Sequence, residues 1–106
     1  MLTFELAQFV VRDGAEEALL AERPAMVRAL REAFPTMLAA WLTREDDGSW
    51  LDVVLWESRE AAEEAARRVN EVAEARSWFG HIAESRGLRH VEIVDEQLFA
   101  LDHRPA

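Results

Sequence analysis

Three tryptophans and one aspartate in the middle of the chain form the group best suited to chemistry. A hairpin predicted between residues 37 and 56 places Trp41, Trp50 and Trp56 with Asp52 on one face of a sheet. Tryptophan offers a large flat surface and one N–H donor, so the three side chains could stack a flat aromatic molecule. Their alternative role is ordinary core or interface packing, and for Trp56 we expect a structural role.

Asp52 is a candidate general base. Desolvation beside tryptophans on a central strand could raise its pKa enough for it to take a proton from a phenol or an activated carbon. Glu5 and Glu92 support the same argument with less force, because the sequence does not decide which face of their strands points inward. The alternative for Asp52 is a hairpin carboxylate that bonds Thr43 or stays near water.

His81 is the second candidate for proton transfer. It follows the second predicted helix, and Trp78 and Phe79 precede it closely. The alternative is a partly exposed histidine near a helix-end carbonyl group. We expect His90 on the surface of a strand and His103 in the C-terminal tail.

Several kinds of site lack their sequence signals. The absence of cysteine excludes disulfides, iron–sulfur clusters and thiolate zinc sites. No pair of histidines has a metal-binding spacing, no serine stands at a telling distance from a histidine, and no glycine-rich phosphate loop is present. The sequence therefore gives no reason to propose a metal ion or an organic cofactor.

Length and charge limit the protein class. The 106 residues suffice for one core, and 12 basic against 21 acidic residues give a net charge of −9, which opposes binding to nucleic acid. No apolar run is long enough to span a membrane. The N-terminal MLTFELAQFVV has no basic leader and no small-residue cleavage pattern. We expect a cytoplasmic protein without a nucleic-acid or membrane partner.

Hydrophobic periodicity predicts the elements that position these residues. Strands are expected at residues 3–12, 37–45, 49–56 and 88–94, and helices at residues 15–34 and 59–76. Pro24 predicts a kink or a restart of the first helix. Ser58 is the expected N-cap of the second helix, and Ser77 the expected start of a short further helix that Gly87 ends.

A two-residue loop at Asp47 and Gly48 sets the predicted register of the hairpin. It pairs Thr43 with Asp52 and leaves the opposite face purely aliphatic. The residues of that face are Leu38, Ala40, Leu42, Leu51, Val53 and Leu55.

The element order predicts an α+β protein with the ferredoxin-like split βαβ arrangement, β-α-β-β-α-β, in which two helices cover one face of a four-stranded antiparallel sheet. The other face is then a large apolar patch, which a second copy packed sheet to sheet would cover. We therefore expect a homodimer. Residues 1–97 form the predicted domain and residues 98–106 a C-terminal tail, whose first half we expect to pack because Leu98 and Phe99 are apolar.

Two motifs resemble a known family. VVRDG at positions 10–14 ends the first strand in a glycine that opens the helix, and LWESREAAEEA at positions 55–65 is similar to a strand-to-helix junction with tryptophan, serine and Glu-Ala at set positions. Both resemble the antibiotic-biosynthesis-monooxygenase-like domains of the dimeric α+β barrels. The resemblance covers Thr3 to about Gln97.

The resemblance implies a place for a ligand. Members of this family include cofactor-independent oxygenases of electron-rich aromatic polyketides, haem-degrading enzymes and dimers without a known reaction. In the enzymes the ligand generally lies within each subunit, between sheet and helices. The residues implied to line that pocket are Trp41, Trp50, Asp52 and Trp56, with Glu5, Ala7 and Phe9 from the first strand.

The resemblance also concerns His81. The haem-degrading branch places its iron-ligating histidine close to this position, where Trp78 and Phe79 could face a porphyrin. Ala7 and Ala65 stand where that branch has an asparagine and a tryptophan. Haem degradation is therefore not expected, whereas haem binding stays open.

Three functions remain open. The first is a cofactor-independent monooxygenase of an aromatic polyketide-like substrate. The second is a non-catalytic dimeric module that binds a planar apolar ligand such as haem, and the third is a dimer with a purely structural role. The fold supports all three equally. In the first, Asp52 or His81 takes a proton, and the ring is held by Trp41, Trp50, Trp56, Phe9 and Trp78.

Overall fold

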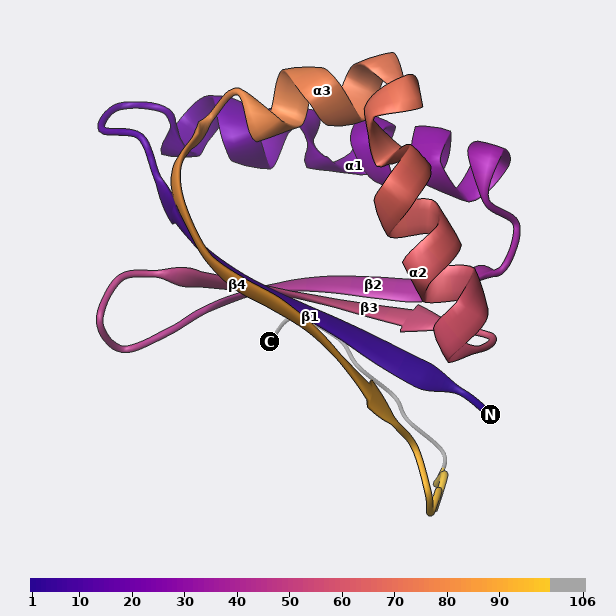
Figure 1. Ribbon diagram of the computed structural model, residues 1–106. Helices are drawn as coiled ribbons and strands as arrows, with labels where there is room; N and C mark the ends of the chain where they lie inside the picture. Colours follow the sequence, from indigo (N-terminus) through magenta and orange to yellow (C-terminus); the bar gives the residue numbers. More distant parts are fainter. Residues whose placement is uncertain (100–106) are drawn as a thin grey trace.

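The computed structural model describes residues 1–99. Within them the chain folds in the order β1 (Thr3–Val11), α1 (Glu16–Ala33), β2 (Met37–Arg44), β3 (Trp50–Trp56), α2 (Arg59–Arg68), the 3₁₀ turn η1 (Val69–Glu71), α3 (Ala73–Phe79) and β4 (Ile82–Glu92). The strands form one antiparallel sheet in the order β2-β3-β1-β4, and the helices lie on one side of it (Figure 1). This confirms the predicted ferredoxin-like α+β arrangement.

The core lies between the helices and the covered face of the sheet. The central strands β1 and β3 send alternate side chains there, among them Phe9, Val54 and Trp56, because successive residues of a strand point to opposite faces. Helix α1 contributes Leu19 and Met26. None of the helices within residues 1–99 is long and apolar enough to cross a membrane.

Both helix ends of the second half differ in part from the prediction. Ser58 caps α2 as expected, since its Oγ accepts a hydrogen bond of 3.1 Å from the amide of Ala61. The predicted single helix over residues 59–76 is broken, however, because Val72 adopts an extended backbone between η1 and α3. Ser77 lies inside α3 and does not cap a further helix.

Two other expectations about special residues are wrong. Helix α1 runs through the exposed Pro24 without the predicted restart. Gly87 does not end a helix but lies within β4, which begins already at Ile82. Its φ of +126° falls where the β1–β4 pairing shifts register, between Ala7 and Phe9 of the neighbouring strand, so the glycine accommodates an irregularity of the ladder.

The hairpin loop has three residues, not the predicted two. The amide of Glu45 donates to the carbonyl of Ser49 (2.8 Å), and the amide of Gly48 donates back to the carbonyl of Glu45 (3.0 Å). Gly48 has a φ of +87°, the left-handed residue that follows the turn in such loops. Asp47 accepts hydrogen bonds from the amide and the hydroxyl of Ser49 (2.9 and 2.6 Å) and so holds the loop.

The longer loop shifts the β2–β3 register by one residue from the prediction. Leu42, not Thr43, now pairs with Asp52, and Trp41 pairs with Val53. Since a shift by one residue reverses the faces of a strand, Trp41 points away from the helices and is 50% exposed. The face that was expected to be purely aliphatic therefore carries Trp41, whose ring meets Phe4 edge-on at 6.5 Å.

The sheet face opposite the helices is uncovered in the single chain. We call it the helix-free face, and its apolar residues are Phe4, Leu6, Trp41, Leu51, Val53, Leu55 and Val91. Leu98 and Phe99 of the tail are 83% and 85% exposed, so the expected packing is not seen for these two residues. Residues 100–106 lie outside the described part.

The left-handed conformation of Gly48 makes the loop testable. Gly48→Ala should lower the free energy of unfolding by about 1 kcal/mol, because a Cβ is disfavoured in this backbone region. Gly48→Asn should lose less, since asparagine tolerates the same conformation. Urea denaturation measures both; equal stability of the two variants and the parent would contradict the three-residue loop.

Candidate functional site

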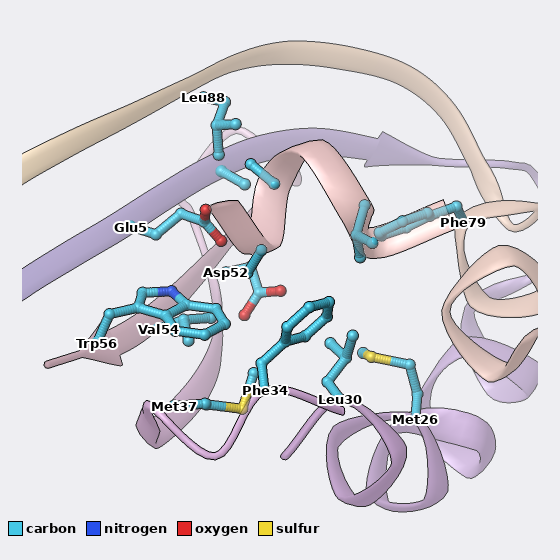
Figure 2. A pocket seen from close by; sticks show the side chains of 14 residues that line it. Glu5, Met26, Leu30, Phe34, Met37, Asp52, Val54, Trp56, Phe79 and Leu88 are labelled. Carbon is cyan, nitrogen blue, oxygen red and sulfur yellow. The ribbon is translucent and has the colours of Figure 1, made fainter. Parts of the chain in front are cut away.

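A cavity of about 150 Å³ lies between the covered face of the sheet and the helices (Figure 2). Its wall is apolar except for the side chains of Glu5 and Asp52. The full lining is Glu5 and Ala7 of β1, Asp52, Val54 and Trp56 of β3, Met26 and Leu30 of α1, Phe34, Met37, Ala65 and Ala66 of α2, Val69, Phe79 and Leu88.

Small side chains on α2 leave this space open. Ala65 and Ala66 face the sheet where larger residues would fill the gap. Leu88 and Phe79 are the lining residues most open to solvent, at 52% and 36% exposure, so they mark the mouth. A dry protein cavity of about 150 Å³ can hold one benzene ring. The space therefore suits a single-ring aromatic molecule better than a tricyclic polyketide or a porphyrin.

Asp52 is held in an ion pair with Arg23 of α1. The two guanidinium nitrogens donate to the two carboxylate oxygens at 2.7 and 2.9 Å, and the side chains of Arg23 and Asp52 are only 12% and 16% exposed. The guanidinium also lies 5.1 Å from the ring centre of Trp78. The expected bond from Thr43 to Asp52 is not formed, because Thr43 Oγ1 donates to the carbonyl of Leu51.

Sequence reasoning missed Arg23, although a signal was present. Arg23 follows the buried Leu19 by four residues and precedes the buried Met26 by three, so it stands on the apolar stripe of α1. A charged residue in such a stripe needs a buried partner of opposite charge. That partner is Asp52.

Glu5 is the second charged residue of the cavity, and its surroundings differ from those of Asp52. Burial is the main cause that raises the pKa of Glu5, and the negative charge of Asp52 adds to it. A hydrogen bond between Glu5 Oε2 and His90 Nε2, 3.0 Å long, acts in the opposite direction. Within residues 1–99, Oε1 of Glu5 has no hydrogen-bond partner.

Trp56 adds a polar atom without a partner to the same wall. Its indole Nε1 is buried and forms no hydrogen bond with any described residue. The ring lies beside the Glu5 carboxylate in the cavity wall (Figure 2). Trp56 is thus a core residue, as expected, and also part of the cavity.

His81 does not share a cavity with Asp52. It lies in the turn between α3 and β4, and no histidine is part of the cavity lining. Its Nε2 is 2.7 Å from a carboxylate oxygen of Glu22 on α1. Hydrogen bonds with His81 and Ser77 lower the pKa of Glu22. The expectation that His81 and Asp52 act on one ligand is therefore not met.

Most of the predicted ring-holding residues also lie outside the cavity. Trp50 is buried beneath the guanidinium of Arg44, 4.4 Å from its ring centre. Trp78 meets Phe9 edge-on at 5.6 Å within the core, and its Nε1 donates to the carbonyl of Leu19. Trp41 lies on the helix-free face. Of the five predicted residues only Trp56 lines the cavity, where Phe34 and Phe79 supply the other aromatic rings.

The cavity does not fit a haem held by a protein histidine, because its lining contains none. Among residues 1–99, no three histidine, aspartate or glutamate side chains converge in a way that could hold a metal ion. The chemistry available in the cavity is therefore that of two carboxylates, one indole N–H and apolar walls.

Comparison with solved structures identifies the class of fold. A candidate antibiotic biosynthesis monooxygenase from Bordetella bronchiseptica superposes with a TM-score of 0.65 at 26% identity, covering 88% of this chain and 97% of that chain. Further matches are of the same kind. The chain thus has an antibiotic-biosynthesis-monooxygenase-like fold, as the two sequence motifs predicted. Neither a protein-family model nor a curated protein sequence matches it.

Two similar structures carry different descriptions. SnoaB, a cofactor-independent oxygenase from Streptomyces nogalater, matches in a mutant form with a TM-score of 0.68 at 15% identity, over 90% of this chain and 95% of that chain. A mutant of MhuD with two manganese protoporphyrin IX molecules per active site matches with a TM-score of 0.63 at 22% identity, over 92% and 99%. At these identities the likeness concerns the fold alone.

The ion pair between Arg23 and Asp52 should contribute to stability as a unit. Arg23→Met keeps the stem of the side chain but leaves the Asp52 charge without its partner, so the free energy of unfolding should fall by about 2 to 4 kcal/mol. In an Asp52→Asn background the same substitution should cost at least about 1 kcal/mol less. Urea denaturation of the four proteins gives the coupling energy; strictly additive effects would contradict a functional ion pair.

Proposed function

We propose that the protein is a small cofactor-independent monooxygenase that acts on a compact aromatic molecule with an acidic O–H or C–H group. The observation that supports this proposal is an apolar cavity of single-ring size with two carboxylates in its wall. Apolar surroundings strengthen electrostatic interactions and admit little water. Phe34, Phe79 and Trp56 would hold the ring, and a cavity carboxylate would take the proton.

The reaction needs only the substrate and molecular oxygen. Removal of one proton leaves an electron-rich substrate anion that can reduce oxygen directly. For an activated methylene group the balance is CH2 + O2 → C=O + H2O, in which the substrate carbon is oxidised and one oxygen atom leaves as water. Holding the anion in a cavity closed to bulk water would limit side reactions.

Asp52 and Glu5 are the groups placed to act in this way. Asp52, the base expected from the sequence, lines the cavity, but Arg23 occupies both of its oxygens. His81 is placed at the Glu22 carboxylate and reaches no cavity wall. The size of the cavity narrows the expected substrate from a polyketide to a single hydroxylated ring.

We further propose that the active form is a homodimer. The helix-free face exposes seven apolar side chains that a second copy could cover sheet to sheet. Residues 1–97 would form the dimerising domain, and Leu98 would begin the tail.

Filling the cavity tests the proposed function. Ala65→Leu should weaken binding of hydroquinones or simple phenols at least about tenfold and lower oxygen uptake in parallel, because the added side chain occupies the space of the ring. Ala21→Leu, at an exposed position of α1, should leave both unchanged. Calorimetry measures binding and an oxygen electrode measures turnover.

The outcomes separate the alternatives. Binding without oxygen uptake in the parent protein would replace the enzyme by a binding module for planar apolar ligands. Neither binding nor uptake across the panel would leave a structural role.

The homodimer has its own test. Light scattering should give twice the chain mass for the parent protein, and Val53→Lys should give the monomer mass because a charge is placed at the centre of the helix-free face. Ala21→Lys adds the same charge on exposed α1 and should remain dimeric. A parent protein that is monomeric at micromolar concentration would contradict the proposal.

A further inference from the structure

The two carboxylates of the cavity have different partners, and this difference assigns them different roles. We propose that Glu5 is the catalytic residue that takes the substrate proton, that His90 is the residue that positions it, and that the Arg23–Asp52 pair is a fixed charge beside them. This inference rests on the proposed function, because it names the base of that same cavity.

Glu5 has an oxygen left for a substrate. Oε2 is held by His90 Nε2 at 3.0 Å, whereas Oε1 makes no hydrogen bond within the described residues. The carboxylate points from β1 into the cavity beside Asp52 and Trp56 (Figure 2). A general base must reach the proton that it removes within hydrogen-bond distance. Oε1 of Glu5 is placed to do so for a ring that fills the cavity.

Asp52 is placed less well for the same task. Both of its oxygens accept hydrogen bonds from Arg23, and both side chains are largely buried. Protonation of Asp52 would leave a buried guanidinium group without its counter-charge, which is costly. Asp52 therefore stays a fixed negative charge during the reaction.

His90 is built into the sheet in a way that fixes its side chain. It stands directly opposite Glu5 in the β1–β4 ladder, and the side chains of the pair are only 14% and 16% exposed. Its backbone carbonyl accepts a hydrogen bond from Arg59 of α2 at 3.1 Å. The hydrogen bond from Nε2–H then orients one oxygen of Glu5 and leaves the other toward the cavity.

Charged groups reach Glu5 from every side of the cavity. Asp52 of β3 raises the pKa of Glu5, in addition to the larger effect of burial, and His90 of β4 lowers it. Arg23 of α1 acts through Asp52, and Arg59 of α2 acts through the carbonyl of His90. A raised pKa makes Glu5 a stronger base than an exposed glutamate, and its activity is lost as the pH falls through that pKa.

The proton balance of this step is simple. The O–H or C–H bond of the substrate breaks, its proton forms a bond to Oε1 of Glu5, and the electron pair stays on the substrate, where it reduces oxygen. Glu5 then returns the proton to the reduced oxygen, which leaves as water. The carboxylate is regenerated for the next turnover.

The pH dependence of turnover tests the roles of His90 and Asp52. In His90→Leu the acid limb of the kcat profile should move to higher pH, because both effects of His90 lower the pKa of Glu5. His90→Gln can keep the hydrogen bond and should shift the limb less. Asp52→Asn should move it to lower pH, since a negative charge near Glu5 is lost. A merely structural role of these residues would not produce shifts of opposite sign.

Glu5→Gln tests the base itself. Its kcat should fall about 100-fold or more while the dissociation constant of a hydroquinone changes less than about threefold. Glu84→Gln, an exposed carboxylate of β4, should match the parent. If the parent consumes oxygen and Glu5→Gln retains its rate, the assignment of the base is overturned and the monooxygenase function stands. If the parent consumes none, the proposed function fails and the assignment with it.

Discussion

The structure depends on the burial of two carboxylates against one face of a sheet. Pairing of the central strands sets Ala7 opposite Asp52 and Val54 opposite Glu5, so both acids point toward the helices. A charge buried in this way is stable only with a partner. Arg23 pairs with Asp52 from the first helix, and His90 pairs with Glu5 from the edge strand. The two pairs therefore tie α1 and β4 to the centre of the sheet.

The different chemistry of these partners is what makes the cavity more than a packing defect. Arginine keeps its charge at all physiological pH values, whereas histidine changes its charge near neutrality. One carboxylate is thus held as an anion and the other can exchange a proton within the same apolar wall. Alanines on α2 leave room for a ligand beside them. Similar folds described as oxygenases and as porphyrin-binding proteins show that the fold itself does not decide the reaction.

The hairpin shows how a small local difference changes a surface. One additional loop residue, with Gly48 in a left-handed conformation, moved Trp41 from the expected pocket to the helix-free face. Alternation along β3 did not depend on that loop, so Asp52 and Trp56 face the helices as expected. Loop length is decided by hydrogen bonds at Asp47 and Ser49 that a strand pattern does not contain.

The sequence by itself determined the order of the elements, the antiparallel sheet, the N-cap at Ser58 and the inward face of the first strand. These features follow from side-chain periods of two or about four residues and from local capping, which act between near neighbours in the chain. Only the tertiary structure decided that Asp52 meets Arg23, 29 positions away, and that Glu5 meets His90, 85 positions away. Such partners are chosen by how helices and strands pack, because desolvation of a charge is set by everything around it and not by its neighbours in sequence.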